Sequence, residues 1–227
     1  MQSKRNDIIA LLLSMCVPSL AALAYFVFLG ESPAARVVYA VSRAFLIAFP
    51  VTWFLLVERG RVRWPTWNTR AAALGAAFAL LVGAAAWTLY QYWLNEALDF
   101  TDVKRKAAAL HVREHYVLFA AFLSLANSAV EEYYWRWFVF GRCRRHLALA
   151  GAAILSGLAF AAHHCIVLVV MFGSVAGAGL TLGVAIGGVF WAWLYDRYGS
   201  LYASWISHLL VDVAVMSIGY RMLETAG

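Results

Sequence analysis

The chain has 227 residues, of which 64% are hydrophobic and 13% are charged, and its formal net charge is +6. A soluble domain of this length hides its apolar residues behind a polar shell, and this chain has too few polar residues to build one. Its basic residues stand in short clusters between long apolar runs, which is typical of membrane topology determinants and argues against nucleic acid as a partner. The composition therefore predicts a single integral membrane domain, residues 1–227, in contact with the lipid bilayer.

Seven apolar segments follow one another along the chain. Each is long enough to cross a bilayer, which takes roughly 20 residues at a rise of about 1.5 Å per residue. We place them near 8–29, 35–57, 71–94, 116–139, 148–172, 174–195 and 201–220. Because lipid offers no hydrogen bonds to the backbone, spans of this kind are expected to be helical. The predicted fold is an all-α polytopic bundle of about seven transmembrane helices.

The first segment follows Lys4 and Arg5, as the apolar part of a signal peptide does, but it is too long for a typical cleaved peptide and predicts a retained helix. The distribution of Lys and Arg between the loops favours a cytoplasmic N-terminus. The connection 95–115 mixes acidic and basic residues and predicts a short amphipathic helix at the membrane interface. The Ala- and Arg-rich composition favours a bacterial inner membrane.

Glycines recur at four-residue spacing within 173–188. Small residues at this spacing allow two helix backbones to approach closely, so this segment predicts a tightly packed central helix. The three cysteines, Cys16, Cys143 and Cys165, have no spacing typical of a disulfide framework or a thiolate metal site. Cys165 follows two histidines; we interpret it as a buried thiol that fills space, with a nucleophile as the alternative.

Ionisable residues stand inside three of the predicted spans, where each costs about 2.5–3.5 kcal/mol on the insertion scale. They are Glu131, Glu132 and Arg136 in the fourth span, His163 and His164 in the fifth, and His208 and Asp212 in the seventh. Because three different helices carry such residues, we expect their side chains to converge inside the bundle.

Helical spacing indicates which of these side chains share a face. Glu132 and Arg136 are four residues apart and are expected to form an ion pair. Glu131 points about 100° away around the helix and lacks that partner. His208 and Asp212 are also four apart, so the carboxylate is expected to hydrogen-bond the imidazole and fix its tautomer. A free carboxylate with oriented histidines is suited to activating a water and stabilising an oxyanion.

The three spans carry motifs that resemble those of the CPBP family (CAAX proteases and bacteriocin-processing enzymes, also called Abi), which are intramembrane glutamic proteases. That family carries EExxxR, FxxxH and HxxxN/D on successive membrane helices in this order. Here the motifs read EEYYWR at 131–136, FAAHH at 160–164 and HLLVD at 208–212. The resemblance covers about residues 116–220.

This resemblance implies that Glu131 is the general base that activates water, assisted by His164. It implies that His208 and the residue at Asp212 stabilise the tetrahedral intermediate. The family often has asparagine in this last position, and an ionised aspartate cannot donate a hydrogen bond. Asp212 is therefore either protonated or orients His208, which then acts as the sole oxyanion donor.

The remaining motif residues receive supporting roles from the resemblance. Glu132 and Arg136 are expected to hold the fourth helix and the polarity of the pocket. The FxxxH spacing pairs Phe160 with His164, so His163 is interpreted as a neighbour that lines the cavity or faces another helix. Arg43, inside the second span, either snorkels, pairs with a carboxylate or marks a misplaced boundary, and we assign it no role.

The sequence thus predicts an intramembrane endopeptidase without metal or cofactor, whose cavity opens to the cytoplasmic side. Its expected substrate is a membrane-associated protein or peptide, such as a sorting tail or a leader. A zinc-dependent membrane metalloprotease is an alternative, since two histidines and a carboxylate can bind zinc, although HExxH is absent. A proton-coupled transporter or a non-catalytic scaffold is another, since intramembrane Glu, His and Asp form proton relays, but no repeated halves occur.

Overall fold

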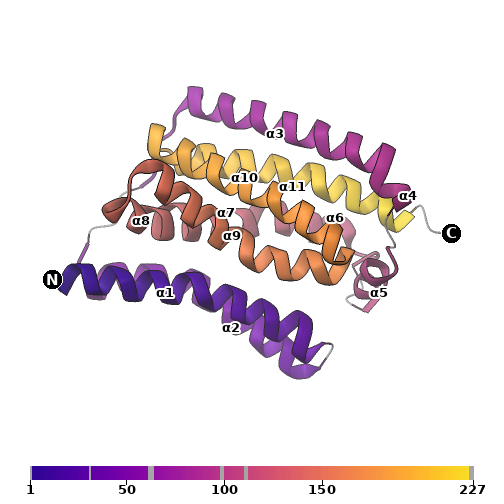
Figure 1. Ribbon diagram of the computed structural model, residues 1–227, viewed down its shortest axis with the longest axis horizontal. Coiled ribbons are helices and arrows are strands. Elements are labelled where there is room, and N and C mark those ends of the chain that lie inside the picture. Colours follow the sequence, from indigo (N-terminus) through magenta and orange to yellow (C-terminus); the bar gives the residue numbers. More distant parts are fainter. Residues whose placement is uncertain (1, 31, 61–63, 98–99, 110–111, 225–227) are drawn as a thin grey trace.

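The structure is a computed structural model that describes residues 2–30, 32–60, 64–97, 100–109 and 112–224. Within these ranges the chain forms helices joined by short connections and has no strand, which confirms the all-α prediction (Figure 1). The elements, with η for π-helical turns, are α1 (Gln2–Leu23), η1 (Ala24–Leu29), α2 (Pro33–Thr52), η2 (Trp53–Val57), α3 (Thr69–Leu89), η3 (Tyr90–Leu94), α4 (Asn95–Ala97), α5 (Thr101–Ala109), α6 (Tyr116–Ala121), η4 (Phe122–Asn127), α7 (Ser128–Glu132), η5 (Tyr133–Phe140), α8 (Gly141–His146), α9 (Leu149–Phe172), α10 (Ser174–Tyr198) and α11 (Leu201–Glu224).

Long helical runs pass back and forth between the two ends of the bundle, and the N- and C-termini lie at opposite ends (Figure 1). In the part of the chain that is described, six helices are long and apolar enough to cross a membrane. They are Lys4–Leu29, Pro33–Val57, Thr69–Leu94, Leu149–Phe172, Ser174–Tyr198 and Leu201–Glu224. These six runs correspond to six of the seven predicted spans.

The remaining predicted span lies in the helical run 116–146, which comprises α6, η4, α7, η5 and α8. This run is not among the six because Glu131, Glu132 and Arg136 make it too polar for the same criterion. Its α-helical turns alternate with the π-helical turns η4 and η5 on either side of Glu131 and Glu132. Such π-helical turns often occur at functional sites, because they change which side chains face a neighbouring helix.

Helices α9 and α10 form the closest helix pair, and glycines make their approach possible. A methyl group built on Gly188 would lie 3.0 Å from the Cα atom of Gly157, and one on Gly177 would lie 2.6 Å from the Cα atom of Val169. The glycine spacing therefore correctly predicted close packing at these two positions. Gly179 and Gly183 have open space beside them, so the four-residue pattern does not mark one continuous contact.

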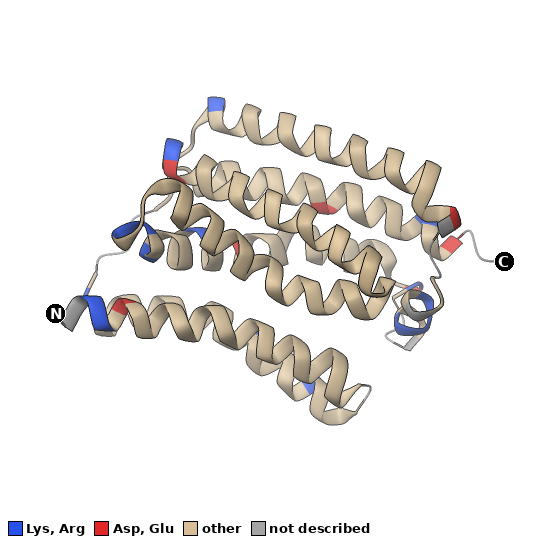
Figure 2. Ribbon diagram, viewed as in Figure 1, with Lys and Arg blue, Asp and Glu red and all other residues tan. Residues whose placement is uncertain are grey.

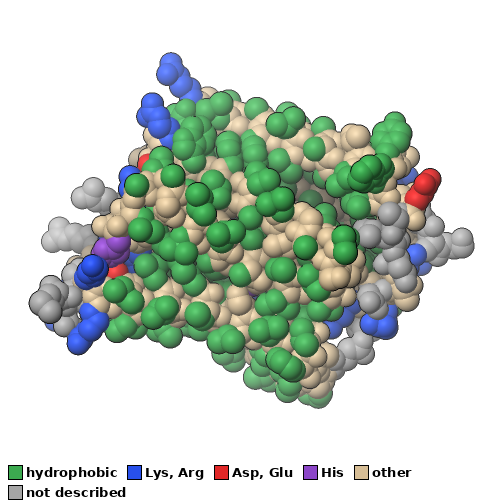
Figure 3. All heavy atoms as spheres, viewed as in Figure 1, with side chains coloured by type: hydrophobic (Ala, Val, Ile, Leu, Met, Phe, Trp, Pro, Cys, Tyr) green, Lys and Arg blue, Asp and Glu red, His purple; other side chains and the backbone are tan. Residues whose placement is uncertain are grey.

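The face of the bundle that Figure 3 shows is largely apolar between its two ends. Large hydrophobic side chains are highly exposed on the molecule, among them Phe28, Leu56 and Leu80. Most Lys and Arg residues lie at the two ends, while a few acidic residues stand at mid-height (Figure 2). This division between apolar sides and charged ends is what a bilayer requires of a protein that spans it. The short helix α5 confirms the helix predicted in 95–115, whose place at the interface stays a prediction.

An ion-pair network joins α1, the end of η2 and α8 at the end of the bundle that holds the N-terminus. We call it the end cluster: Asp7, Glu58, Arg142, Arg145 and His146. Glu58 pairs with Arg142 through one carboxylate oxygen and with Arg145, at 2.8 Å, through the other. Asp7 pairs with Arg145 at 2.9 Å and with His146 Nε2 at 2.8 Å. The end cluster therefore fastens the N-terminal hairpin of α1 and α2 to the motif-bearing helices.

Candidate active site

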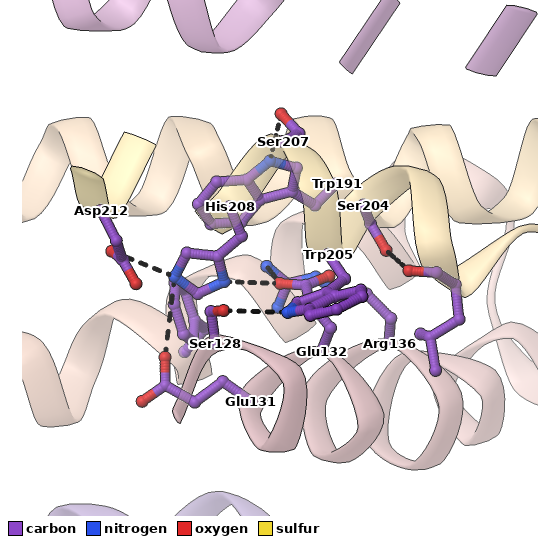
Figure 4. Close-up of polar contacts among 12 residues, drawn as sticks. Ser128, Glu131, Glu132, Arg136, Trp191, Ser204, Trp205, Ser207, His208 and Asp212 are labelled. Atoms are coloured by element: carbon purple, nitrogen blue, oxygen red, sulfur yellow. Dashed lines mark hydrogen bonds and ion pairs between the residues drawn. The ribbon is translucent and has the colours of Figure 1, made fainter. Parts of the chain in front are cut away.

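Helices α7, η5 and α11 bring four ionisable side chains together inside the bundle (Figure 4). Glu131 and Glu132 are 3% and 0% exposed, Arg136 is 1% exposed, and His208 is 4% exposed. Groups buried this deeply carry a large desolvation cost unless they are paired and hydrogen-bonded. Each of these four side chains therefore needs a charged or hydrogen-bonding partner inside the bundle.

Glu132 is the centre of this arrangement. Its Oε1 atom lies 3.0 Å from Nη2 of Arg136, which confirms the predicted ion pair. The same oxygen accepts a hydrogen bond of 2.9 Å from Nδ1 of His208 (Figure 4). One buried carboxylate therefore neutralises the guanidinium and fixes the imidazole of another helix. Glu132 does more than the structural role that its spacing from Arg136 suggests.

The expected hydrogen bond between Asp212 and His208 is not formed. Asp212 Oδ1 lies 3.7 Å from Nε2 of His208, which is longer than a hydrogen bond. The prediction was wrong because a carboxylate from a neighbouring helix, Glu132, approaches the imidazole more closely than the one four residues along the same helix. Glu132, and not Asp212, therefore fixes the His208 tautomer.

Nε2 of His208 faces two carboxylates at once. It lies 3.7 Å from Oε2 of Glu131 and 3.7 Å from Oδ1 of Asp212. Neither distance is a hydrogen bond, so this nitrogen remains free to bond a substrate or a water. The Asp212 side chain is 23% exposed, so it stands at the edge of the buried group.

Two aromatic rings contact the His208 imidazole. Trp191 of α10 stacks on it with ring centroids 4.2 Å apart and planes at 18°, and Phe160 meets it edge-on at 5.8 Å. The indole Nε1 of Trp191 donates a 3.0 Å hydrogen bond to Ser207 Oγ. The guanidinium of Arg136 lies 5.1 Å from the Trp191 ring. Trp191 belongs to no motif, and no pattern in the sequence of α10 sets it apart from Trp193.

The histidine pair of α9 approaches Glu131 from another direction. His164 Nδ1 donates a 3.0 Å hydrogen bond to the Phe160 carbonyl oxygen, so its Nε2 is left to act as an acceptor or base. His163 stacks parallel to Trp135 with ring centroids 5.6 Å apart. Ligand atoms of Glu131, His163 and His164 all lie within 4.8 Å of one another, a spacing that a metal ion could bridge. His163 is therefore part of the group and not a distant neighbour.

Sequence reasoning also missed the polar neighbours of Glu131 on its other side. Arg43 of α2 donates a hydrogen bond from Nη1 to Oδ1 of Asn127, the last residue of η4. Asn127 stands four residues before Glu131, and its side-chain amide interacts with the Glu131 carboxylate. The polar character of Arg43 inside an apolar span was the available signal, but spacing along the chain cannot show which distant helix it faces.

The structure therefore brings all eight predicted site residues into one connected group. A buried carboxylate, Glu131, stands between the imidazoles of His164 and His208. Such a group can take a proton from water and can offer N–H donors to a developing negative charge, which are the two requirements of hydrolysis at a carbonyl carbon.

A family model described as type II CAAX prenyl endopeptidase Rce1-like matches residues 113–214. No curated protein and no solved structure matches the chain. The matched segment holds every motif residue from Glu131 to Asp212 and leaves the first three membrane helices outside. Proteins of this family are intramembrane peptidases, which agrees with the apolar bundle around the site. Over residues 113–214, somewhat less than half of its length, the chain is similar to the Rce1-like type II CAAX prenyl endopeptidases of the CPBP family.

Proposed function

We propose that the protein is a glutamic intramembrane endopeptidase in which Glu131 activates the attacking water. The observation that carries this proposal is the meeting of Glu131 with the imidazoles of two other helices at a buried site. Glu131 Oε2 lies 3.7 Å from His208 Nε2, and its ligand atom lies within 4.8 Å of those of His163 and His164. Burying a carboxylate in a membrane span costs free energy, and this cost favours a functional role for Glu131 over a purely structural one.

In the proposed reaction, the Glu131 carboxylate takes a proton from a water, and the oxygen of that water attacks the carbonyl carbon of the scissile peptide bond. His164 assists through Nε2, since its Nδ1 is bonded to the Phe160 carbonyl. The carbonyl oxygen becomes an oxyanion and accepts a hydrogen bond from Nε2–H of protonated His208. The C–N bond then breaks as the proton held by Glu131 passes to the leaving nitrogen.

Glu132 and Asp212 receive different roles in this proposal. Glu132 holds His208 through Nδ1, so that Nε2 points toward Glu131 and the reacting carbonyl. Asp212 stands at the exposed edge of the site and tunes the polarity around His208 without fixing its orientation. The substrate is a membrane-associated protein or peptide, with a sorting tail or a leader as the preferred class.

Glu131→Gln tests the proposal most directly, because the amide keeps the shape of the side chain but cannot take a proton from water. Wild type and the variant are expressed in membranes of the same host, and new protein termini are compared by mass spectrometry. We expect termini that depend on wild type and vanish in E131Q, with equal amounts of folded protein. Glu96→Gln, at an exposed position in α4, is the matched control. Identical termini from wild type and E131Q would contradict the proposal.

A zinc-assisted version of the same hydrolysis is a second candidate, because Glu131, His163 and His164 are close enough to share one ion. It makes a separate prediction for His163, which is a metal ligand in this version only. His163→Phe should abolish cleavage if zinc is required. It should leave most of the cleavage activity if the reaction needs no metal. Metal analysis of the purified protein and cleavage in chelator distinguish the two versions in the same preparation.

A further inference from the structure

Arg43 stands near the middle of α2 and is the only Lys or Arg between Arg36 and Arg59 in the sequence. Its side chain is half-buried, and the buried Nε atom has no hydrogen-bond partner in the part of the chain that is described. Placing a guanidinium at membrane depth costs free energy, so its presence there suggests a function. The contacts of the side chain indicate what that function is.

The Arg43 guanidinium turns toward the active site and not toward the end of the bundle. It passes over the Tyr39 ring, with Cζ 5.1 Å from the ring centroid, and Nη1 donates to Oδ1 of Asn127. A snorkelling arginine would instead extend toward the membrane surface. Arg43 is therefore held across the interface between α2 and η4 by a bond to one side chain.

The bond from Arg43 determines how Asn127 meets Glu131. Because Oδ1 of Asn127 accepts from Arg43, the amide group left for Glu131 is the NH₂, which can only donate. Glu131 stands four residues further along the same helical run, where its carboxylate interacts with the Asn127 amide. The order is thus cation, amide, carboxylate: Arg43 donates to Asn127, and the Asn127 NH₂ group is the one available to Glu131.

We propose that Arg43 is a positioning residue that acts through Asn127 to hold the Glu131 carboxylate in its reactive orientation. This inference rests on the proposed role of Glu131 as the base. A carboxylate held by a fixed donor keeps one oxygen in place while the other faces the histidines and the water. Arg43 lies outside residues 113–214, so the N-terminal hairpin contributes to the reaction as well as to packing.

Steady-state kinetics of four variants test the relay. We expect Arg43→Met and Asn127→Ala each to lower kcat by about 10- to 100-fold with little change in KM, because a misplaced base affects chemistry and not binding. The double variant should be no slower than the slower single variant, since both break one relay. Arg43→Lys should recover part of the rate because it keeps a charge and a donor. Arg36→Met, on the exposed first turn of α2, is the matched control and should behave as wild type.

Three kinetic outcomes overturn the relay. They are wild-type kcat in both single variants, an effect on KM alone, and losses in the double variant that multiply. A loss of rate that only follows a loss of folded protein, measured by thermal unfolding, also overturns it.

Infrared spectroscopy tests the relay without any substrate. The carboxylate stretching band of Glu131 is identified as the band that disappears in E131Q. We expect this band to shift in R43M and in N127A and to stay in place in R36M, because only the first two variants change what Glu131 accepts. An unshifted band in both variants overturns the relay. If the band shifts but no variant and no wild type cleaves any protein, the relay stands and the proposed function fails.

Discussion

Two clusters of ionisable side chains lie in this bundle, the buried active site and the partly exposed end cluster, and they differ in how completely their atoms are paired. In the end cluster each carboxylate oxygen has its own nitrogen partner: Glu58 meets Arg142 and Arg145, and Asp7 meets Arg145 and His146. Burial lowers the pKa of Arg142 to about 10, with Glu58 acting in the opposite direction, so this guanidinium remains charged at neutral pH. Among the described residues, Arg142 Nε is the one buried polar atom of the end cluster without a hydrogen-bond partner, so this network is nearly closed.

The active site is not closed in this way. Glu132 Oε1 serves two partners, while Glu132 Oε2, Arg136 Nε and His163 Nδ1 have no hydrogen-bond partner in the described ranges. Nε2 of His208 lies between two carboxylates without bonding either. Buried polar groups are rarely left in this state, and when they are, a catalytic role is one of the usual reasons. The contrast indicates that the end cluster stabilises the fold, whereas the site keeps hydrogen-bonding capacity for a reaction.

Among substitutions that leave Glu131 in place, the largest expected effect comes from Glu132→Met. Cleavage should fall by about 10³-fold, because His208 loses the acceptor that orients its oxyanion donor. The free energy of unfolding should also fall, by about 3–5 kcal/mol, since Arg136 becomes an unpaired buried charge. Activity assays and thermal unfolding in detergent measure the two effects.

The double variant Glu132→Met with Arg136→Met separates these two effects. Replacing both partners of a buried ion pair by apolar side chains is often neutral for stability. We expect the melting temperature to recover while activity stays low. Recovery of both would mean that Glu132 contributes only its ion pair and does not act through His208.

Glu58→Ala breaks the end cluster instead. Arg142, which is 2% exposed, would lose its carboxylate partner, and we expect the free energy of unfolding to fall by about 3 kcal/mol. The kcat of the folded protein should not change, because the end cluster shares no bond with the site. Glu224→Gln is the matched control, since its pair with Arg113 is exposed and should contribute almost nothing. A large fall in kcat in E58A would show that the two groups are coupled.

Trp191→Leu tests a residue that contacts the active site but lies outside the three motifs. The variant removes the ring that stacks on His208, and kcat should fall by about tenfold, which corresponds to about 1.4 kcal/mol of transition-state stabilisation. Trp193→Leu, two residues away and 37% exposed, is the control for loss of an indole from the same helix. Equal effects of both substitutions would argue against a specific role for Trp191.

The smallest effect is expected for Asp212→Asn. Because Glu132 already fixes the His208 tautomer, replacing the Asp212 carboxyl group by an amide, which offers an N–H donor, should change kcat by less than about threefold. Cleavage assays of D212N beside wild type measure this. A loss of two orders of magnitude would restore Asp212 to the orienting role that its spacing from His208 suggested.

Spacing within one helix predicted part of the site correctly and part of it incorrectly. The Glu132–Arg136 pair is set by the helical repeat, since side chains four residues apart lie on one face wherever the helix packs. The same argument failed for His208 and Asp212. It gives the nearest neighbour along a helix, and here a residue of another helix is nearer.

The sequence by itself determined that the chain is a helical membrane bundle and that ionisable groups from three helices belong together. Apolar length dictates spanning helices, and buried charge is too costly to occur without a purpose. Only the tertiary structure decided which nitrogen of His208 meets which carboxylate, that Trp191 stacks on it, and that Arg43 reaches Asn127. These contacts join helices far apart in the chain, and their distances depend on how closely the helices pack, as α9 and α10 do where Gly157 meets Gly188.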